Sequence, residues 1–207
     1  MKFAWLCMAV ICLMQYGCGE DLCQKSDLHY GGLCIQKGFN IAKDEVETLV
    51  AVTEAEVQRY YPEVVDIKNK FKDEQIRVEF IDGLLAMDCD NYEKDVYVCE
   101  HYIGGVNYNA HHIYVEYDEC LGATALAHEL LHSIDDFYLD AVYDNNEEND
   151  HDRPWFFTNY LDTIGEDRSL EIIDVRIGIN LLCTLNSCAE WRQGYLCQNL
   201  WPRLTGK

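Results

Sequence analysis

The run from Ala127 to Phe137, AHELLHSIDDF, constrains this chain more than any other stretch. It holds two histidines four positions apart, His128 and His132, with Glu129 beside the first. Helical side chains four positions apart lie on one face, one above the other. The two imidazoles can therefore bind one metal ion, and a catalytic zinc needs about three protein ligands plus an open position for water. Glu129 lies to one side, where it can take a proton from that water.

The residues around this motif have the periodicity of a long helix, which we expect over residues 123–142. His128 and His132 lie off its apolar stripe. We therefore expect the stripe to pack on a sheet while the histidines face a cleft. The stripe consists of Leu126, Leu130, Ile134, Phe137 and Ala141.

The remaining elements complete an α+β pattern with a small mixed sheet and a C-terminal helical part. Apolar alternation predicts strands over 76–81, 95–102 and 112–117, with Gly104 and Gly105 ending the second. Helical spacing predicts helices over 44–61 and 169–182. Asp44 is expected to cap the first of these, paired with Glu47, and Ser169 to cap the second.

The first 19 residues have the order of an export signal. Lys2 precedes an apolar run over residues 3–14 that is too short to span a bilayer. One cleavage compatible with the pattern follows Gly19. The other precedes Cys18, which would become the lipidated first residue of a lipoprotein. Residues 20–207 then form one domain, exported and either secreted or held at the cell envelope.

The cysteines agree with export. Of 11 cysteines, two lie in the signal and Cys18 is either lipidated or removed. An even set of eight remains, which in an exported chain predicts four disulfides. The shortest loops would join Cys23 to Cys34 and Cys89 to Cys99. The set is Cys23, Cys34, Cys89, Cys99, Cys120, Cys183, Cys188 and Cys197.

The charge excludes one class of partner. The chain has 37 acidic and 16 basic residues, a net charge of -21, so it repels phosphate backbones and we expect no nucleic-acid binding. No second apolar run of membrane length follows the signal, which leaves a lipid on Cys18 as the means of membrane attachment. The acidic stretch 144–153 lacks the glycine and spacing of an EF-hand, so a solvated loop is favoured over a calcium site. We expect a monomer.

The motif resembles those of the zincin metallopeptidases. The compact metzincin form does not fit, because Asp135 and Tyr138 stand where it has a glycine and a third histidine. The glutamate-zincins fit better, and among them the protease domain of anthrax lethal factor and its relatives, which carries a similar H-E-x-x-H-x-[VI]-D-D-aromatic run over residues 128–137. The resemblance implies a zincin-like fold and a zinc-dependent endopeptidase acting on peptides or proteins, with Glu129 as general base.

In that family the third zinc ligand is a glutamate from a later helix. One helix cannot bring a third side chain round to a metal already held at positions i and i+4, which argues against Asp136 and Asp140. Glu171 opens the predicted helix 169–182 and is our choice, with Asp174 one turn later as the runner-up. His151 and Glu166 remain as further alternatives.

Other roles stay open at this level. Asp135 and Asp136 either hold a histidine ring in place or form an exposed acidic turn. Tyr138, Tyr160 and His151 are candidates for a donor to the transition state. The strand 112–117 is expected to pair with an extended substrate.

Two other functions compete with the peptidase. The first is a non-catalytic envelope binding protein with a disulfide-stabilised, zincin-shaped domain, favoured by the absence of an obvious third ligand. The second is an acidic calcium-binding surface protein, which would need the 144–153 stretch to bind calcium.

Overall fold

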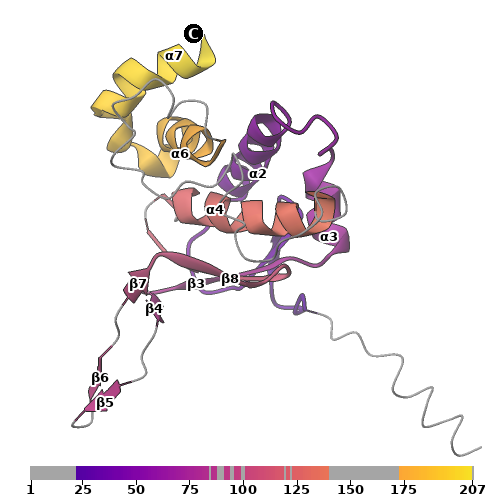
Figure 1. The fold of residues 1–207 in the computed structure, drawn as a ribbon, viewed down its shortest axis with the longest axis vertical. Helices are drawn as coiled ribbons and strands as arrows, with labels where there is room; N and C mark the ends of the chain where they lie inside the picture. The colour runs from indigo at the N-terminus through magenta and orange to yellow at the C-terminus, as the bar shows by residue number, and fades with distance from the viewer. Residues whose placement is uncertain are drawn as a thin grey trace, which may run out of the picture.

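A mixed five-stranded sheet with helices on one face forms the body of the molecule (Figure 1). The computed structural model describes residues 22–83, 85–87, 91–93, 96–98, 101–118, 120–121, 123–139 and 173–206. The strand order is β1 (Leu28–Tyr30), β2 (Leu33–Ile35), β3 (Arg77–Ile81), β9 (His112–Glu116) and β8 (Gly105–Asn109). The three inner strands are parallel, whereas β1 and β8 run antiparallel to their neighbours. The predicted α+β class is confirmed.

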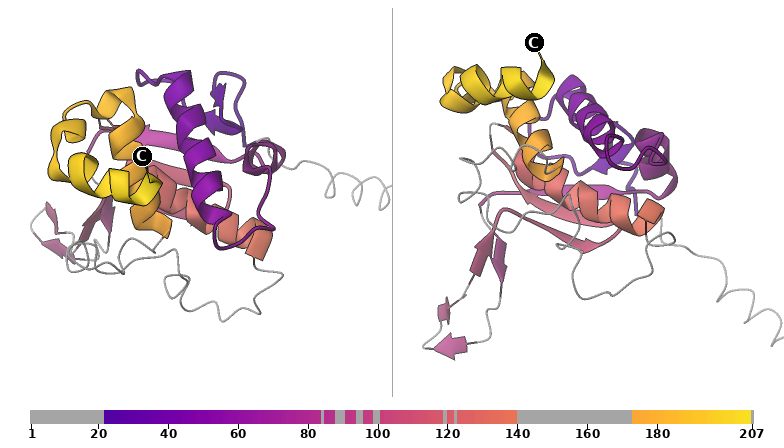
Figure 2. Two further views of the ribbon diagram at one scale, coloured as in Figure 1. Left: turned by 90° about the horizontal axis from the view of Figure 1, so that it is seen from above. Right: turned by 45° about the horizontal axis from the view of Figure 1, so that its top comes forward.

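The helices gather over one face of this sheet, as two further views confirm (Figure 2). The larger ones are α2 (Lys43–Val57), α3 (Ile67–Asp73), α4 (Ala123–Ile134) and α6 (Ile173–Thr184). A π-helical turn, Asp135–Leu139, continues α4. After α6 the chain forms the short helical segments Asn186–Cys188, Trp191–Gln193 and Leu196–Leu200, and then α7 (Trp201–Thr205). This matches the expected C-terminal helical part.

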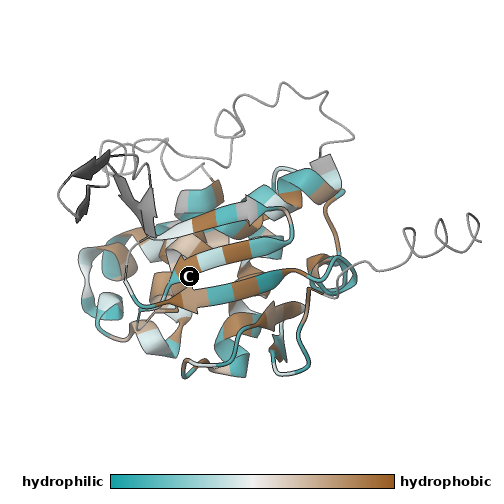
Figure 3. Cartoon of the chain, turned by 90° about the horizontal axis from the view of Figure 1, so that it is seen from below, coloured by the Kyte–Doolittle hydropathy of each residue, from teal (hydrophilic) through white to brown (hydrophobic). Residues whose placement is uncertain are grey.

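The core lies between the sheet and α4. Ile113 and Val115 of β9 are fully buried, and so are Leu126, Leu130 and Ile134 of α4. Hydrophobic and hydrophilic residues alternate along the strands when the sheet is seen from below (Figure 3), as expected for a sheet with one covered face. The predicted apolar stripe is therefore confirmed for these three residues of α4.

The first predicted helix differs at both ends. It begins at Lys43 with Ala42 at the N-cap and no side-chain cap, so the cap predicted for Asp44 is wrong. Glu47 lies instead within reach of two lysines, 3.4 Å from the nearer, Lys68. The helix ends at Val57 rather than near residue 61, because the N–H groups of Arg59 and Tyr60 bond three residues back and tighten the chain into turns.

The predicted strand 95–102 divides between two separate ribbons. Its first part is β6 (Val96–Val98), paired with β5 (Asn91–Glu93), and its second is β7 (His101–Ile103), paired with β4 (Leu85–Met87). The break expected at two glycines is also partly wrong, since β8 begins at Gly105. A two-residue link, Ala110 and His111, joins β8 to β9 in a hairpin, but neither residue is typical of such turns, so no local signal marks this strand.

Three disulfides stabilise the described part of the chain, and they indicate an oxidising environment outside the cytosol. They join Cys23 to Cys34, as predicted, Cys120 to Cys188, and Cys183 to Cys197. The predicted pairing of Cys89 with Cys99, the signal segment and the acidic stretch 144–153 lie outside the described residues. Among the residues that are described, no helix has the length and apolar character needed to cross a bilayer.

Candidate metallopeptidase site

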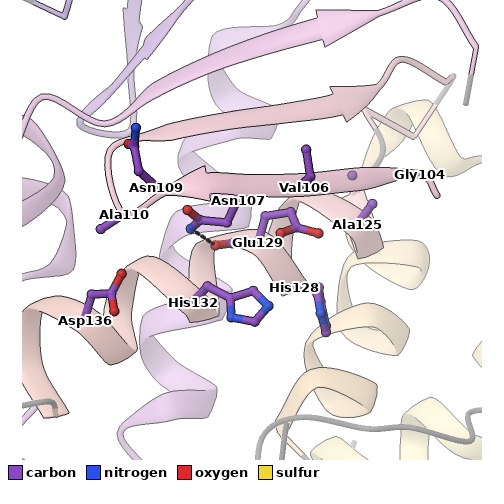
Figure 4. Close-up of a pocket in the computed structure, with 11 residues that line it drawn as sticks. Gly104, Val106, Asn107, Asn109, Ala110, Ala125, His128, Glu129, His132 and Asp136 are labelled. Carbon is purple, nitrogen blue, oxygen red and sulfur yellow. Dashed lines mark hydrogen bonds between the residues drawn. The ribbon is translucent and has the colours of Figure 1, made fainter. Parts of the chain in front are cut away.

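A cavity of about 600 Å³ opens between α4 and the edge strand β8 (Figure 4). The helix contributes both histidines and Glu129, and the strand contributes small and amide side chains. Gly104, Gly105, Val106, Asn107, Asn109, Ala110, Ala125, His128, Glu129, His132 and Asp136 line it. The expectation that the histidines face a cleft while the leucines pack on the sheet is therefore met.

His128 and His132 lie side by side along the helix. Their ring centroids are 5.1 Å apart and the ring planes cross at 81°. Leu130 and Leu131, between them in sequence, are fully buried, which turns the two imidazoles to the open side of α4. This is the arrangement that the i, i+4 spacing predicts.

His128 has a carboxylate partner on another helix. Its Nδ1 lies 3.1 Å from Oδ2 of Asp174, in the first turn of α6. Burial alone would lower the pKa of His128, but the hydrogen bond and charge of Asp174, together with the charge of Glu129, raise it. A carboxylate on Nδ1 leaves Nε2 as the nitrogen for a metal. Asp174, the predicted runner-up ligand, thus contacts a motif histidine through its carboxylate.

Glu129 is held against the edge strand. It is only 7% exposed, and a Cβ on Gly105 would lie 3.1 Å from its Cγ and 3.2 Å from its Oε1. Burial raises the pKa of Glu129, against the opposing effects of the His128 charge and a hydrogen bond from the Asn107 backbone. A raised pKa makes the carboxylate a better proton acceptor near neutral pH.

A second contact between strand and helix was missed by the sequence reasoning. Nδ2 of Asn107 donates to the Glu129 carbonyl at 2.9 Å and to Ser133 Oγ at 2.9 Å, and Ser133 in turn donates to the Ala110 carbonyl at 2.8 Å. No local sequence pattern predicts these hydrogen bonds, because they join residues more than 20 positions apart.

The acidic and aromatic residues that follow the motif lie in different environments. Asp135 is buried at 1% exposure, whereas Asp136 is exposed at the end of the cavity beyond His132 (Figure 4). The Tyr138 hydroxyl donates to the Val65 carbonyl at 2.8 Å, and burial, helped by Glu54 and Asp66, raises its pKa to about 12. Tyr138 is therefore engaged away from the cavity lining.

The predicted third ligand, Glu171, lies outside the described residues. So do His151, Glu166 and Tyr160. Within the described ranges no cluster of three or more His, Cys, Asp or Glu side chains is gathered closely enough to hold a metal. The two imidazoles on one helix face are nevertheless nitrogen donors of the kind that zinc accepts, and the Asp174 carboxylate on Nδ1 of His128 is placed to orient that ring.

The strand available to a substrate is not the one expected. β9 lies between β3 and β8, and it pairs with both. The prediction that strand 112–117 would pair with an extended substrate is therefore wrong, because its backbone groups are already used. In the described part of the sheet β1 and β8 are the edge strands, and β8 is the one that borders the cavity.

Comparisons with known proteins found no match for this chain: no protein-family model, no curated protein and no solved structure.

Proposed function

We propose that this chain is a zinc-dependent endopeptidase of the zincin type. One observation carries the proposal: His128, His132 and Glu129 share a face of α4 and line one cavity beside an edge strand. A metal held by the two imidazoles would have Glu129 next to it and room for a peptide alongside. The zincin-like fold is part of the proposal, supported by the antiparallel edge strand beside the motif helix.

The chain's own residues supply proton transfer and substrate alignment. Zinc, when bound, would polarise the scissile carbonyl and lower the pKa of a water molecule. Glu129 accepts the proton of the attacking water and passes it to the leaving amine. The edge strand β8, which borders the cavity, pairs with the extended peptide through backbone hydrogen bonds. Asp174 holds the His128 ring so that its Nε2 points to the metal position.

Glu129→Gln tests this proposal. We expect the wild type to bind one zinc per chain, measured by plasma mass spectrometry, and to cleave a denatured protein substrate. Glu129→Gln should keep the zinc but lose cleavage by a factor of about 1,000, because the amide cannot accept the proton. His128→Ala should lose the zinc as well.

His29→Ala is a matched control, since His29 lies on β1 with an exposed side chain. It should retain both zinc and cleavage. A folded wild type that takes up no zinc after reconstitution would overturn the proposal and favour the non-catalytic binding protein. Normal cleavage by Glu129→Gln would overturn the mechanism.

The third ligand needs a separate test. Because Asp174 contacts Nδ1 of His128, it suits a supporting role, and we keep Glu171 as the proposed ligand. Glu171→Gln should then weaken zinc binding more than Asp174→Asn, for which we expect a loss of about 10- to 100-fold, as for other groups that orient a ligand. Both dissociation constants are measured by competition with a chromogenic chelator. The reverse order would identify Asp174 as the ligand.

Export is proposed from the first 19 residues, in agreement with the disulfides. The two cleavage sites predict different products, one free and one lipid-anchored through Cys18. Fractionation of cells that express the wild type or Cys18→Ser distinguishes the two cleavage sites. If Cys18 carries lipid, the wild type is found in the membrane fraction and Cys18→Ser in the soluble exported fraction. If the wild type is cleaved after Gly19 and secreted, both proteins are found in the soluble exported fraction.

A further inference from the structure

We propose that Asn107 is a positioning residue that fixes the edge strand β8 and the Glu129 carboxylate relative to each other. The inference deepens the proposed function and rests on it, because it assigns Asn107 a role through the proton acceptor of that mechanism. Asn107 itself is not required to touch the substrate or the metal.

The first support is the geometry of the Asn107 amide. Its two donated bonds, each 2.9 Å long, reach acceptors one helical turn apart on α4, the Glu129 carbonyl and the Ser133 hydroxyl (Figure 4 shows the first). Two bonds at this spacing fix the strand along the helix axis, since a slip of one residue would break both. The bond from Ser133 to the Ala110 carbonyl, at 2.8 Å, adds a third link just beyond the end of β8.

The second support is the burial of Ser133, the helix residue of this network. Ser133 is fully buried, and its hydroxyl accepts from Asn107 and donates to Ala110. Removing the Asn107 amide would deprive the buried Ser133 hydroxyl of that donor. A buried polar group that loses a hydrogen bond lowers the stability of the fold. A hydrogen-bond network that includes a buried hydroxyl favours one arrangement of strand and helix.

The third support is that β8 contacts both the backbone and the side chain of Glu129. The Asn107 amide donates to the Glu129 carbonyl. Two residues earlier, Gly105 packs against the Glu129 carboxylate. The position of the carboxylate relative to the strand that would hold the peptide therefore depends on Asn107. Misplacing a reacting group by about 1 Å can cost roughly 100-fold in rate.

The test compares Asn107→Ala with Ser133→Ala in the zinc-loaded chain. Asn107→Ala should lower kcat by about 100-fold and raise KM, at an unchanged zinc content, because it moves the proton acceptor and the strand that pairs with the peptide but not the ligands. Ser133→Ala should have the same kind of effect but a smaller one, since the bond from Asn107 to the Glu129 carbonyl remains. Asn199→Ala is the control: its amide also donates to a carbonyl, that of Tyr195, at an exposed site in the C-terminal part.

Hydrogen exchange supplies a readout that does not depend on activity. Amides of residues 105–109 should exchange about ten times faster in Asn107→Ala, while the exchange of α2 is unchanged. Wild-type kcat in Asn107→Ala, or a loss that follows zinc content, would overturn the inference. If the wild type cleaves nothing, the proposed function fails, and the exchange rates alone decide whether Asn107 positions the strand. Unchanged exchange would overturn the inference in that case as well.

Discussion

Gly105 shows how much the site depends on one missing side chain. A Cβ at this position would lie 3.1 Å from Cγ and 3.2 Å from Oε1 of Glu129, closer than an ordinary van der Waals contact. Glu129 is the neighbour that can yield, so Gly105→Ala should push the carboxylate away from β8. We expect kcat to fall by roughly 100-fold while one zinc per chain is retained, measured by steady-state kinetics and metal analysis.

Gly38→Ala is the matched control, because a Cβ there would meet nothing within 4 Å. It should leave kcat and zinc content at wild-type values. Equal activity in Gly105→Ala and Gly38→Ala would mean that Glu129 is not held by the strand. A loss of zinc in Gly105→Ala would mean that the substitution disturbs the histidines and not only the carboxylate.

At the level of elements, α6 must be held over α4 for Asp174 to reach His128. A buried ion pair contributes to this: Arg176, two residues after Asp174, bonds Glu56 of α2 at 2.8 Å, and Glu56 is only 5% exposed. Glu56→Gln removes the charge that balances Arg176. We expect the free energy of unfolding to fall by about 2 kcal/mol, measured by urea denaturation.

The same variant should also bind zinc more weakly, because α6 would no longer be fixed at the end that carries Asp174. Glu63→Gln, which removes an exposed acid, serves as the control and should change stability by less than about 0.5 kcal/mol. Wild-type stability and zinc affinity in Glu56→Gln would show that other contacts hold α6 in place.

These elements also show what could be predicted from sequence. The spacing of His128, Glu129 and His132 determines a helix face locally, and the buried leucines follow from the same periodicity. β8 was missed because two glycines read as a break, although one of them is what allows the strand to approach Glu129. The contacts of Asn107 and Asp174 depend on elements that meet only in the folded chain, so no local pattern reveals them.

At the scale of the whole molecule, the disulfides differ in the length of the chain loop that each one closes. Cys120 and Cys188 are 68 residues apart, against 11 for Cys23 and Cys34. Loop-closure entropy then predicts that replacing the first pair by alanine costs roughly 4 kcal/mol and the second roughly 3 kcal/mol. Urea unfolding of the two double variants, at equal pH and zinc concentration, measures the difference.

The two disulfides also differ in what they connect. Cys120 lies just before α4, with its carbonyl accepting the Ala123 N–H at 2.9 Å, and Cys188 follows α6. This bond therefore joins the two helices that carry His128 and Asp174. We expect the Cys120 and Cys188 double variant to bind zinc more weakly than the Cys23 and Cys34 variant, by chelator competition under conditions where both are folded. Equal affinities would show that packing and the Glu56 ion pair align the helices without the disulfide.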